Sequence, residues 1–180
     1  KQGIAIALGL VCDLLKLVGD FYPAVEYMQK NLMLCEELGY QKGIAKAVNT
    51  LGDIFFFTEE YDRSLHFYDR AIEVTRKINH KIVLCSSLIE KGLVLIKVKR
   101  VAELLKVEKE ALALAKELGN PDLIFNARAL EIRALYLHGH TNEALLLLDD
   151  LKKQPLSIEQ QAEAAYIRFR VLLIDKTASD

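Results

Sequence analysis

The chain has 180 residues, about the size of one domain, and its 24 Lys and Arg almost balance its 25 Asp and Glu. The formal net charge of −1 excludes a generally basic nucleic-acid binder and an acidic disordered tail. Because only 9 Gly and 3 Pro supply turns, a many-stranded β protein is excluded as well. The 3 cysteines lack CxxC spacing, which is typical of a reduced, cytoplasmic protein without disulfides or a zinc site.

The first predicted element is a helix over residues 4–18, which carries charge only at Asp13 and Lys16. It is shorter than the ~20 residues that span a membrane, and it lacks the features of a signal peptide, so we predict no membrane association. We interpret it as a buried helix in a piece of a longer protein. Its outer side would then be covered by upstream repeats or by a second copy of the chain.

An internal repeat of forty residues organises the chain and relates residues 2–40 to residues 42–80. In this alignment Gly3 meets Gly43 and Asp13 meets Asp53, and fainter copies follow. Periods of this length are typical of repeat architectures. We expect one domain over residues 1–180, with repeats at about 2–41, 42–81, 82–121 and 122–156 and a final helix at about 157–174.

Each copy is expected to form two helices. Apolar residues recur with helical spacing, for example at Leu65, Tyr68 and Ile72. Ser157 and Gln160 have the spacing of a capping box, which should open the final helix. Turns are predicted within the pairs at 19–20, 59–60, 99–100 and 139–140, and between the pairs at 39–40, 79–80 and 119–121.

The second copy resembles the tetratricopeptide repeat. On the first helix of each repeat, that family carries a large residue, then Leu-Gly, then an aromatic residue. On the second helix it carries an Ala, then an aromatic residue, then a second Ala. A period of forty rather than ~34 residues is similar to the arrays of kinesin light chain, Pins-type polarity scaffolds and MalT-like signalling proteins. The matching residues are Val48, Leu51, Gly52, Phe55, Tyr61, Ser64, Tyr68 and Ala71.

The resemblance implies an all-α fold, a right-handed superhelical solenoid of four helix pairs plus a C-terminal helix. It also implies that the first helix of each pair lines a concave groove, which suits a peptide or a helical segment. The family's groove positions, carried over to this sequence, give these candidate partner-binding residues: Asp13, Lys16, Lys46, Asn49, Asp53, Phe56, Ser86, Lys97, Asn126, Arg133 and Tyr136.

Helical spacing supports part of this set. Lys46, Asn49 and Asp53 share one face of a helix, and Asn126 and Arg133 lie on a second polar strip. Asparagine side chains that bond a peptide backbone, with an Arg nearby, are suited to an extended peptide. The alternative interpretation is that these side chains are solvated helix surface.

Phe55, Phe56 and Phe57 are consecutive, and their rings should point about 100° apart on a helix, so they cannot all face one core. Phe55 occupies the family's core aromatic position. We expect either Phe56 or Phe57 to pack against a neighbouring helix and the other to be an exposed anchor for a partner.

These observations predict a non-catalytic scaffold that binds a peptide or a helical segment. The sequence contains neither a Gly-rich phosphate loop nor a GxSxG elbow, so we expect no enzyme, cofactor or metal. The alternative is a regulatory or sensor module of a larger bacterial signalling or transcription-regulating protein, acting through self-association or docking to an output domain. Nucleic-acid binding through the basic segment 70–109 is a third, disfavoured hypothesis.

Overall fold

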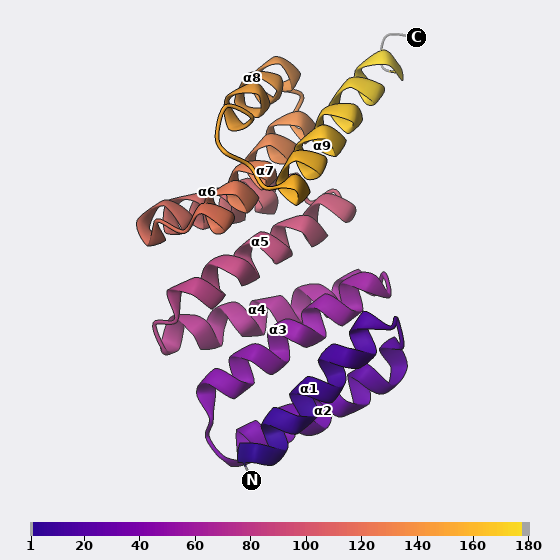
Figure 1. The fold of residues 1–180 in the computed structure, drawn as a ribbon, viewed down its shortest axis with the longest axis vertical. Coiled ribbons are helices and arrows are strands. Elements are labelled where there is room, and N and C mark those ends of the chain that lie inside the picture. The colour runs from indigo at the N-terminus through magenta and orange to yellow at the C-terminus, as the bar shows by residue number, and fades with distance from the viewer. Residues whose placement is uncertain (1, 178–180) are drawn as a thin grey trace. The chain divides into compact units, whose positions relative to one another are not determined.

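Helices joined by short turns make up the computed structural model, which describes residues 2–177 (Figure 1). No strand occurs among these residues, so the predicted all-α class is confirmed. In chain order the helices are α1 (Gln2–Leu17), α2 (Phe21–Glu37), α3 (Gln41–Phe57), α4 (Tyr61–Lys77), α5 (Lys81–Lys97), α6 (Val101–Leu118), α7 (Pro121–Leu137), α8 (Thr141–Leu151) and α9 (Ile158–Thr177).

The chain divides into two compact units, Lys1–Val94 and Leu95–Asp180, and the boundary falls near the end of α5. In the first unit α1 packs on α2, α2 packs on α3, and α3 packs on α4. In the second unit α6 packs on α7 and α7 packs on α8, while α9 contacts both α7 and α8. Consecutive helices are therefore in contact from α1 to α4 in the first unit and from α6 to α9 in the second.

Each unit has its own apolar core, formed by the stripes that the helical spacing predicts. In the first unit Phe55 and Leu51 of α3 pack with Met28 of α2, and all three side chains are almost completely buried. In the second unit Leu148 of α8 packs with Ile167 of α9 in a separate cluster. Burial of these stripes holds each helix against its neighbours, because a single amphipathic helix cannot cover its own apolar face.

The start of α9 confirms the predicted capping box. The Ser157 amide donates to Gln160 Oε1 at 3.1 Å, and the Gln160 amide donates to Ser157 Oγ at 3.2 Å. These two bonds satisfy amides that the first helical turn leaves without backbone partners. The helix then continues to Thr177, three residues beyond the end expected from the sequence.

Seven of the described turns place one residue in the left-handed conformation. In six of these turns the amide that follows closes the turn on a carbonyl five residues earlier, as in Glu60 N to Phe55 O at 2.8 Å. This pairing ends the helix after its last full turn. The residues with positive φ recur every twenty positions, at Gly19, Gly39, Glu59, Asn79, Lys99, Gly119 and Gly139.

Glu59→Gly is expected to raise the free energy of unfolding by about 1 kcal/mol, because Glu59 holds φ at 61° and a Cβ destabilises that conformation. Urea unfolding followed by circular dichroism measures the change. Glu59→Ala is the matched control: it removes the same charge but keeps the Cβ, and should gain nothing. Equal stability of the two variants would contradict the prediction.

Two further observations bear on the predictions from the sequence. No helix in the described part of the chain is both long enough and apolar enough to cross a membrane.

The cysteines Cys12, Cys35 and Cys85 are all buried, and burial raises the pKa of Cys12 and of Cys85 to about 11. A thiol with so high a pKa remains protonated at neutral pH and is a poor nucleophile.

Candidate binding site

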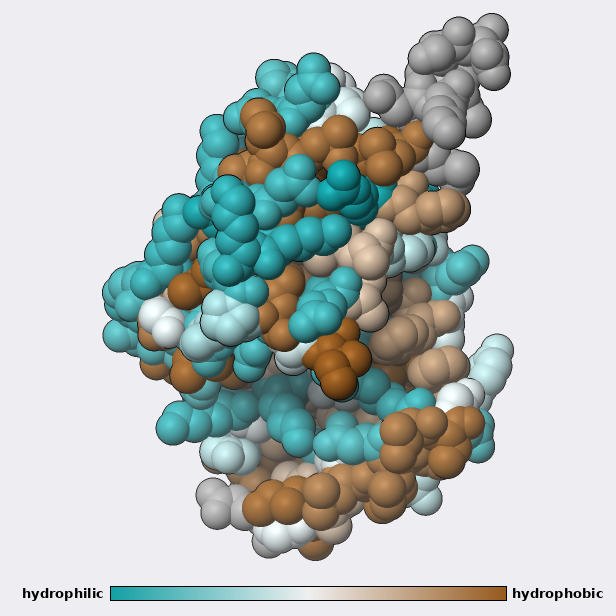
Figure 2. Space-filling model, turned by 45° about the horizontal axis from the view of Figure 1, so that its top comes forward, coloured by the Kyte–Doolittle hydropathy of each residue, from teal (hydrophilic) through white to brown (hydrophobic). Residues whose placement is uncertain are grey.

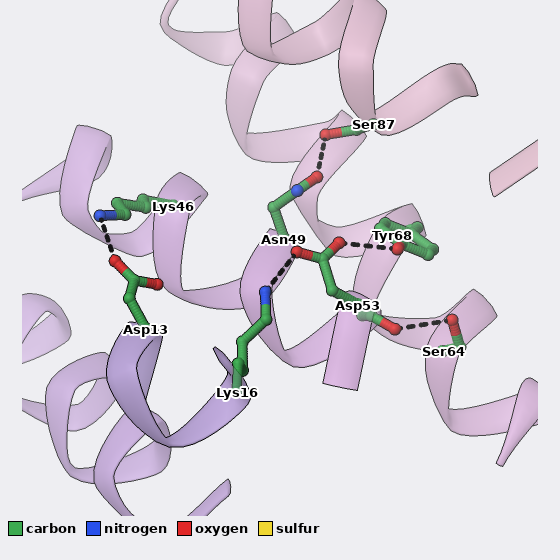
Figure 3. A network of polar contacts seen from close by, with 9 residues as sticks. Asp13, Lys16, Lys46, Asn49, Asp53, Ser64, Tyr68 and Ser87 are labelled. Carbon is green, nitrogen blue, oxygen red and sulfur yellow. Dashed lines mark hydrogen bonds and ion pairs between the residues drawn. The ribbon is translucent and has the colours of Figure 1, made fainter. Parts of the chain in front are cut away.

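A polar network centred on Asp53 connects three helices of the first unit (Figure 3). Lys16 Nζ of α1 lies 3.0 Å from Asp53 Oδ2, and the Tyr68 hydroxyl of α4 donates to Asp53 Oδ1 at 2.8 Å. Both carboxylate oxygens of Asp53 are therefore engaged. Lys16 and Asp53 are about one-quarter exposed or less, so this ion pair is shielded and links α1 to α3 across the helix pair boundary.

Two more contacts surround this network on the first helices (Figure 3). Lys46 Nζ of α3 lies 3.4 Å from Asp13 Oδ2 of α1, and the two side chains are 65% and 44% exposed. Ser87 Oγ of α5 donates to Asn49 Oδ1 at 2.6 Å. The Asp13–Lys46 pair is long and solvated, so it adds little stability and both charges remain accessible.

Glu90 of α5 lies close to the same network in a strongly desolvated position. Burial, together with the nearby carboxylate of Asp53, raises the pKa of Glu90 to about 7, and Lys16 partly opposes this effect. Burial likewise raises the pKa of Tyr68, so its hydroxyl remains a hydrogen-bond donor to Asp53. A carboxyl group with this pKa therefore lies beside the network, and its charge changes near neutral pH.

A pocket opens beside this network between α1, α2 and α3, with a cavity volume of about 140 Å³. Its walls are mostly apolar, and two exposed lysines, Lys42 and Lys46, stand among them. Lys46 thus belongs both to the pocket and to the ion pair with Asp13. The lining residues are Ala5, Ile6, Gly9, Leu10, Met28, Asn31, Cys35, Tyr40, Lys42, Gly43, Lys46 and Ala47.

Side chains of α2 fix the inner wall of the pocket. Asn31 donates from Nδ2 to the Ala5 carbonyl, and the Cys35 thiol donates to Asn31 Oδ1 at 3.2 Å. A Cβ at Gly43 would lie 2.4 Å from a Tyr40 ring carbon and 2.6 Å from Cys35 Sγ. The glycine therefore lets this ring and thiol lie directly against the α3 backbone.

The structure brings five of the predicted residues together on the first unit: Asp13, Lys16, Lys46, Asn49 and Asp53. Lys16, Asn49 and Asp53 make contacts between helices at partly buried positions, whereas the contact between Asp13 and Lys46 lies in solvent. Their role in binding a partner stays a prediction.

The other predicted residues lie apart from this group. Ser86 is half-buried and its hydroxyl donates to the Ile82 carbonyl of its own helix, while Lys97 is exposed at the end of α5. In the second unit Asn126 is exposed, Tyr136 is half-buried, and Arg133 forms an ion pair with Glu163 of α9.

The three consecutive phenylalanines separate as expected, and Phe57 is the exposed ring. Phe55 is buried and stacks on Phe67 at 5.4 Å between ring centroids, with the Arg63 guanidinium 3.7 Å from its centroid on one face. Phe56 is half-buried beside Tyr61. Phe57 is 60% exposed and stacks on Phe21 of α2 at 5.9 Å. The candidate Phe56 is therefore the less accessible of the last two rings.

Sequence reasoning missed the residues that complete the network and the pocket. Helical apolar spacing predicts a buried ring for Tyr68, and the ring is buried, but the hydroxyl of Tyr68 also reaches Asp53. The predicted Ser86 has a neighbour, Ser87, which makes the contact to Asn49. A charge at Glu90, directly after two apolar residues, was the available signal for a desolvated carboxyl group.

No protein-family model and no curated protein sequence matches the chain, but solved structures share its fold. Apo RapI superposes with a TM-score of 0.77 at 14% identity, over 83% of this chain and 55% of RapI. BtubC (BKLC) from P. vanneervenii gives 0.76 at 18% identity, over 85% of this chain and 66% of BtubC. A Podospora anserina protein, described as a kinesin light chain with nearly identical TPR-like repeats, gives 0.73 at 13% identity, over 96% of this chain and 89% of its own.

These likenesses confirm the fold that the repeats predicted: the helix pairs are of the tetratricopeptide type. The chain spans 55% of RapI and 66% of BtubC, so the relatives contain more than the part compared. Stacked helix pairs of this type present extended surfaces. The partner is a separate question, because one fold serves many ligands.

Proposed function

We propose that the chain is a non-catalytic interaction module that binds a peptide or a helical segment on the first unit, at the pocket between α1, α2 and α3. The observation that carries the proposal is the combination of apolar walls with two exposed lysines, Lys42 and Lys46, beside the accessible carboxylate of Asp13. An apolar side chain of the partner enters the pocket, and a flanking acidic group contacts the lysines.

The Asp13–Lys46 pair supports this proposal by its weakness. Because both side chains are largely solvated, exchanging their mutual contact for contacts to a partner costs little. The shielded Lys16–Asp53–Tyr68 contacts then hold the helices on which the pocket residues are placed. Binding therefore needs no change in the network, and the site is largely formed before the partner arrives.

The test is selection of binders from a displayed library of random peptides on the intact chain. Peptides with an apolar residue next to Asp or Glu are expected, and Lys42→Glu/Lys46→Glu should weaken their binding at least tenfold. Lys152→Glu/Lys153→Glu is the matched control, because it changes the charge equally at exposed residues of the second unit. Failure to enrich any peptide, or equal affinity of both double variants, would contradict the proposal.

A regulatory module of a larger signalling protein is the second candidate. The observation that favours it is the exposed apolar side of α1, where Leu14 is 64% and Leu17 is 82% exposed. A module of this kind would change its state of assembly rather than turn over a substrate. Cytoplasmic location and a role in signalling are part of this proposal.

A further inference from the structure

One side of α1 and the residue after it presents an apolar surface with no charged group. At about 100° per residue its members fall within an arc of about 160°, and Asp13 and Lys16 lie outside that arc. Figure 2 shows hydrophobic side chains gathered at the end of the first unit where α1 lies. We call this surface the α1 face; its residues, all exposed, are Ile4, Ile6, Ala7, Leu10, Val11, Leu14, Leu17 and Val18.

The internal repeat shows that the positions equivalent to five of these eight residues are buried. Forty residues later, Ile44, Leu51 and Ile54 of α3 are 6%, 0% and 0% exposed, within a core cluster that includes residues of α2. Their counterparts Ile4, Val11 and Leu14 are 57%, 37% and 64% exposed. The α1 face therefore has the composition of a helix–helix contact surface but lies in solvent.

The α1 face is also wider than the surface that α2 covers on α3. Ile6 stands at the position of Lys46, which is exposed and charged, and Val18 stands at the position of Thr58, which is exposed and polar. A single helix packed as α2 packs on α3 would leave Ile6 without cover. The occupant must instead bring an apolar surface of similar width and equally free of charge.

We propose that the occupant is the α1 face of a second copy of this chain, in a two-fold symmetric dimer. In such a pairing each copy buries the same residues, so apolar groups meet apolar groups and none of the eight residues brings a charge into the contact. The exposed parts of these side chains amount to several hundred Å², the scale of the ~800 Å² per partner of a standard interface. A charge-free apolar centre is typical of permanent homodimers.

The test is the mass of the intact chain in solution, measured by light scattering over a concentration series. We expect a dimer, with twice the 20.4 kDa of one chain, and expect Leu14→Glu to convert it to a monomer. Ile6 and Leu10 belong both to the α1 face and to the pocket, but Leu14 does not line the pocket, so Leu14→Glu distinguishes loss of the dimer from loss of peptide binding. Leu146→Glu is the matched control, since Leu146 is 72% exposed in the second unit and should leave the dimer intact.

A second experiment tests the same dimer by the formation of a covalent product, whereas the first tests it by the loss of the dimer. Leu14→Cys should form a covalent dimer through an intermolecular disulfide under mild oxidation, whereas Leu146→Cys should not, and the native thiols are buried. A monomer at every concentration would overturn the proposal. A dimer that Leu14→Glu leaves intact, or equal cross-linking of the two cysteine variants, would overturn it as well, and the face would then belong to a different protein surface.

Discussion

Gly52→Ala is expected to lower the free energy of unfolding by about 2 kcal/mol, although alanine is the better helix former. A Cβ at this position would lie 2.7 and 2.8 Å from ring carbons of Tyr68. That ring is 1% exposed, and its hydroxyl is held by Asp53 at 2.8 Å, so it cannot move aside without breaking the hydrogen bond. Overpacking should therefore outweigh the gain in helix propensity of about 1 kcal/mol.

The measurement is urea unfolding of Gly52→Ala beside Gly3→Ala. Both substitutions add one methyl group to a helical glycine, but a Cβ at Gly3 meets nothing within 4 Å. The control should therefore gain stability, by up to about 1 kcal/mol. In a Tyr68→Leu background the cost of Gly52→Ala should shrink, which would assign it to the ring. A stabilising effect of Gly52→Ala equal to that of the control would refute the prediction.

Glu90→Gln is expected to raise the free energy of unfolding above neutral pH by up to about 3 kcal/mol and to change little in acid. The pKa of Glu90 is about 7 in the folded chain, whereas the ordinary pKa of a glutamate is 4.5. The folded state binds the proton of Glu90 more tightly than the unfolded chain does. The contribution of Glu90 to stability is therefore fully present below pH 4.5, its ordinary pKa. That contribution is lost as the pH rises through about 7, the pKa of Glu90 in the folded chain. Glutamine keeps the shape and cannot ionise, so the variant avoids this loss.

Urea unfolding near pH 4.5 and near pH 8 provides the test, since these values bracket the expected transition. The difference between wild type and Glu90→Gln should appear only at the higher pH. Glu26→Gln, at an exposed position of α2, is the control and should show no such pH-dependent difference. The same pH dependence in all three proteins would show that the carboxyl group of Glu90 is not desolvated in the folded chain.

The helices could be predicted closely because their signals are local. The turn residues Gly19, Glu59 and Gly139 lie where the alignment of the repeats placed them, and the capping box at Ser157 opens α9 as expected. Local hydrogen bonds and a helical apolar period determine these features. The same spacing also placed Lys46, Asn49 and Asp53 on one helix, with no need for tertiary information.

The contacts across helices could not be predicted in this way. Whether Lys16 reaches Asp53, or Ser87 rather than Ser86 reaches Asn49, depends on how neighbouring helices cross and which rotamers they allow. The pocket shows the same limit, because Asn31 of a second helix forms its inner wall, and the resemblance assigned the groove to first helices. Helical spacing therefore predicts which residues share a helix face, but not the contacts that they make across helices.

The even spacing of the left-handed turn residues determines which changes of length the fold tolerates. Because they recur every twenty positions, deleting or duplicating forty residues joins one turn to an equivalent turn and leaves each remaining side chain on its own face. A single residue inserted inside a helix rotates everything up to the next turn by about 100° and directs the apolar stripe toward solvent. Gain and loss of whole repeats, rather than of single residues, is therefore the kind of length variation that this architecture permits.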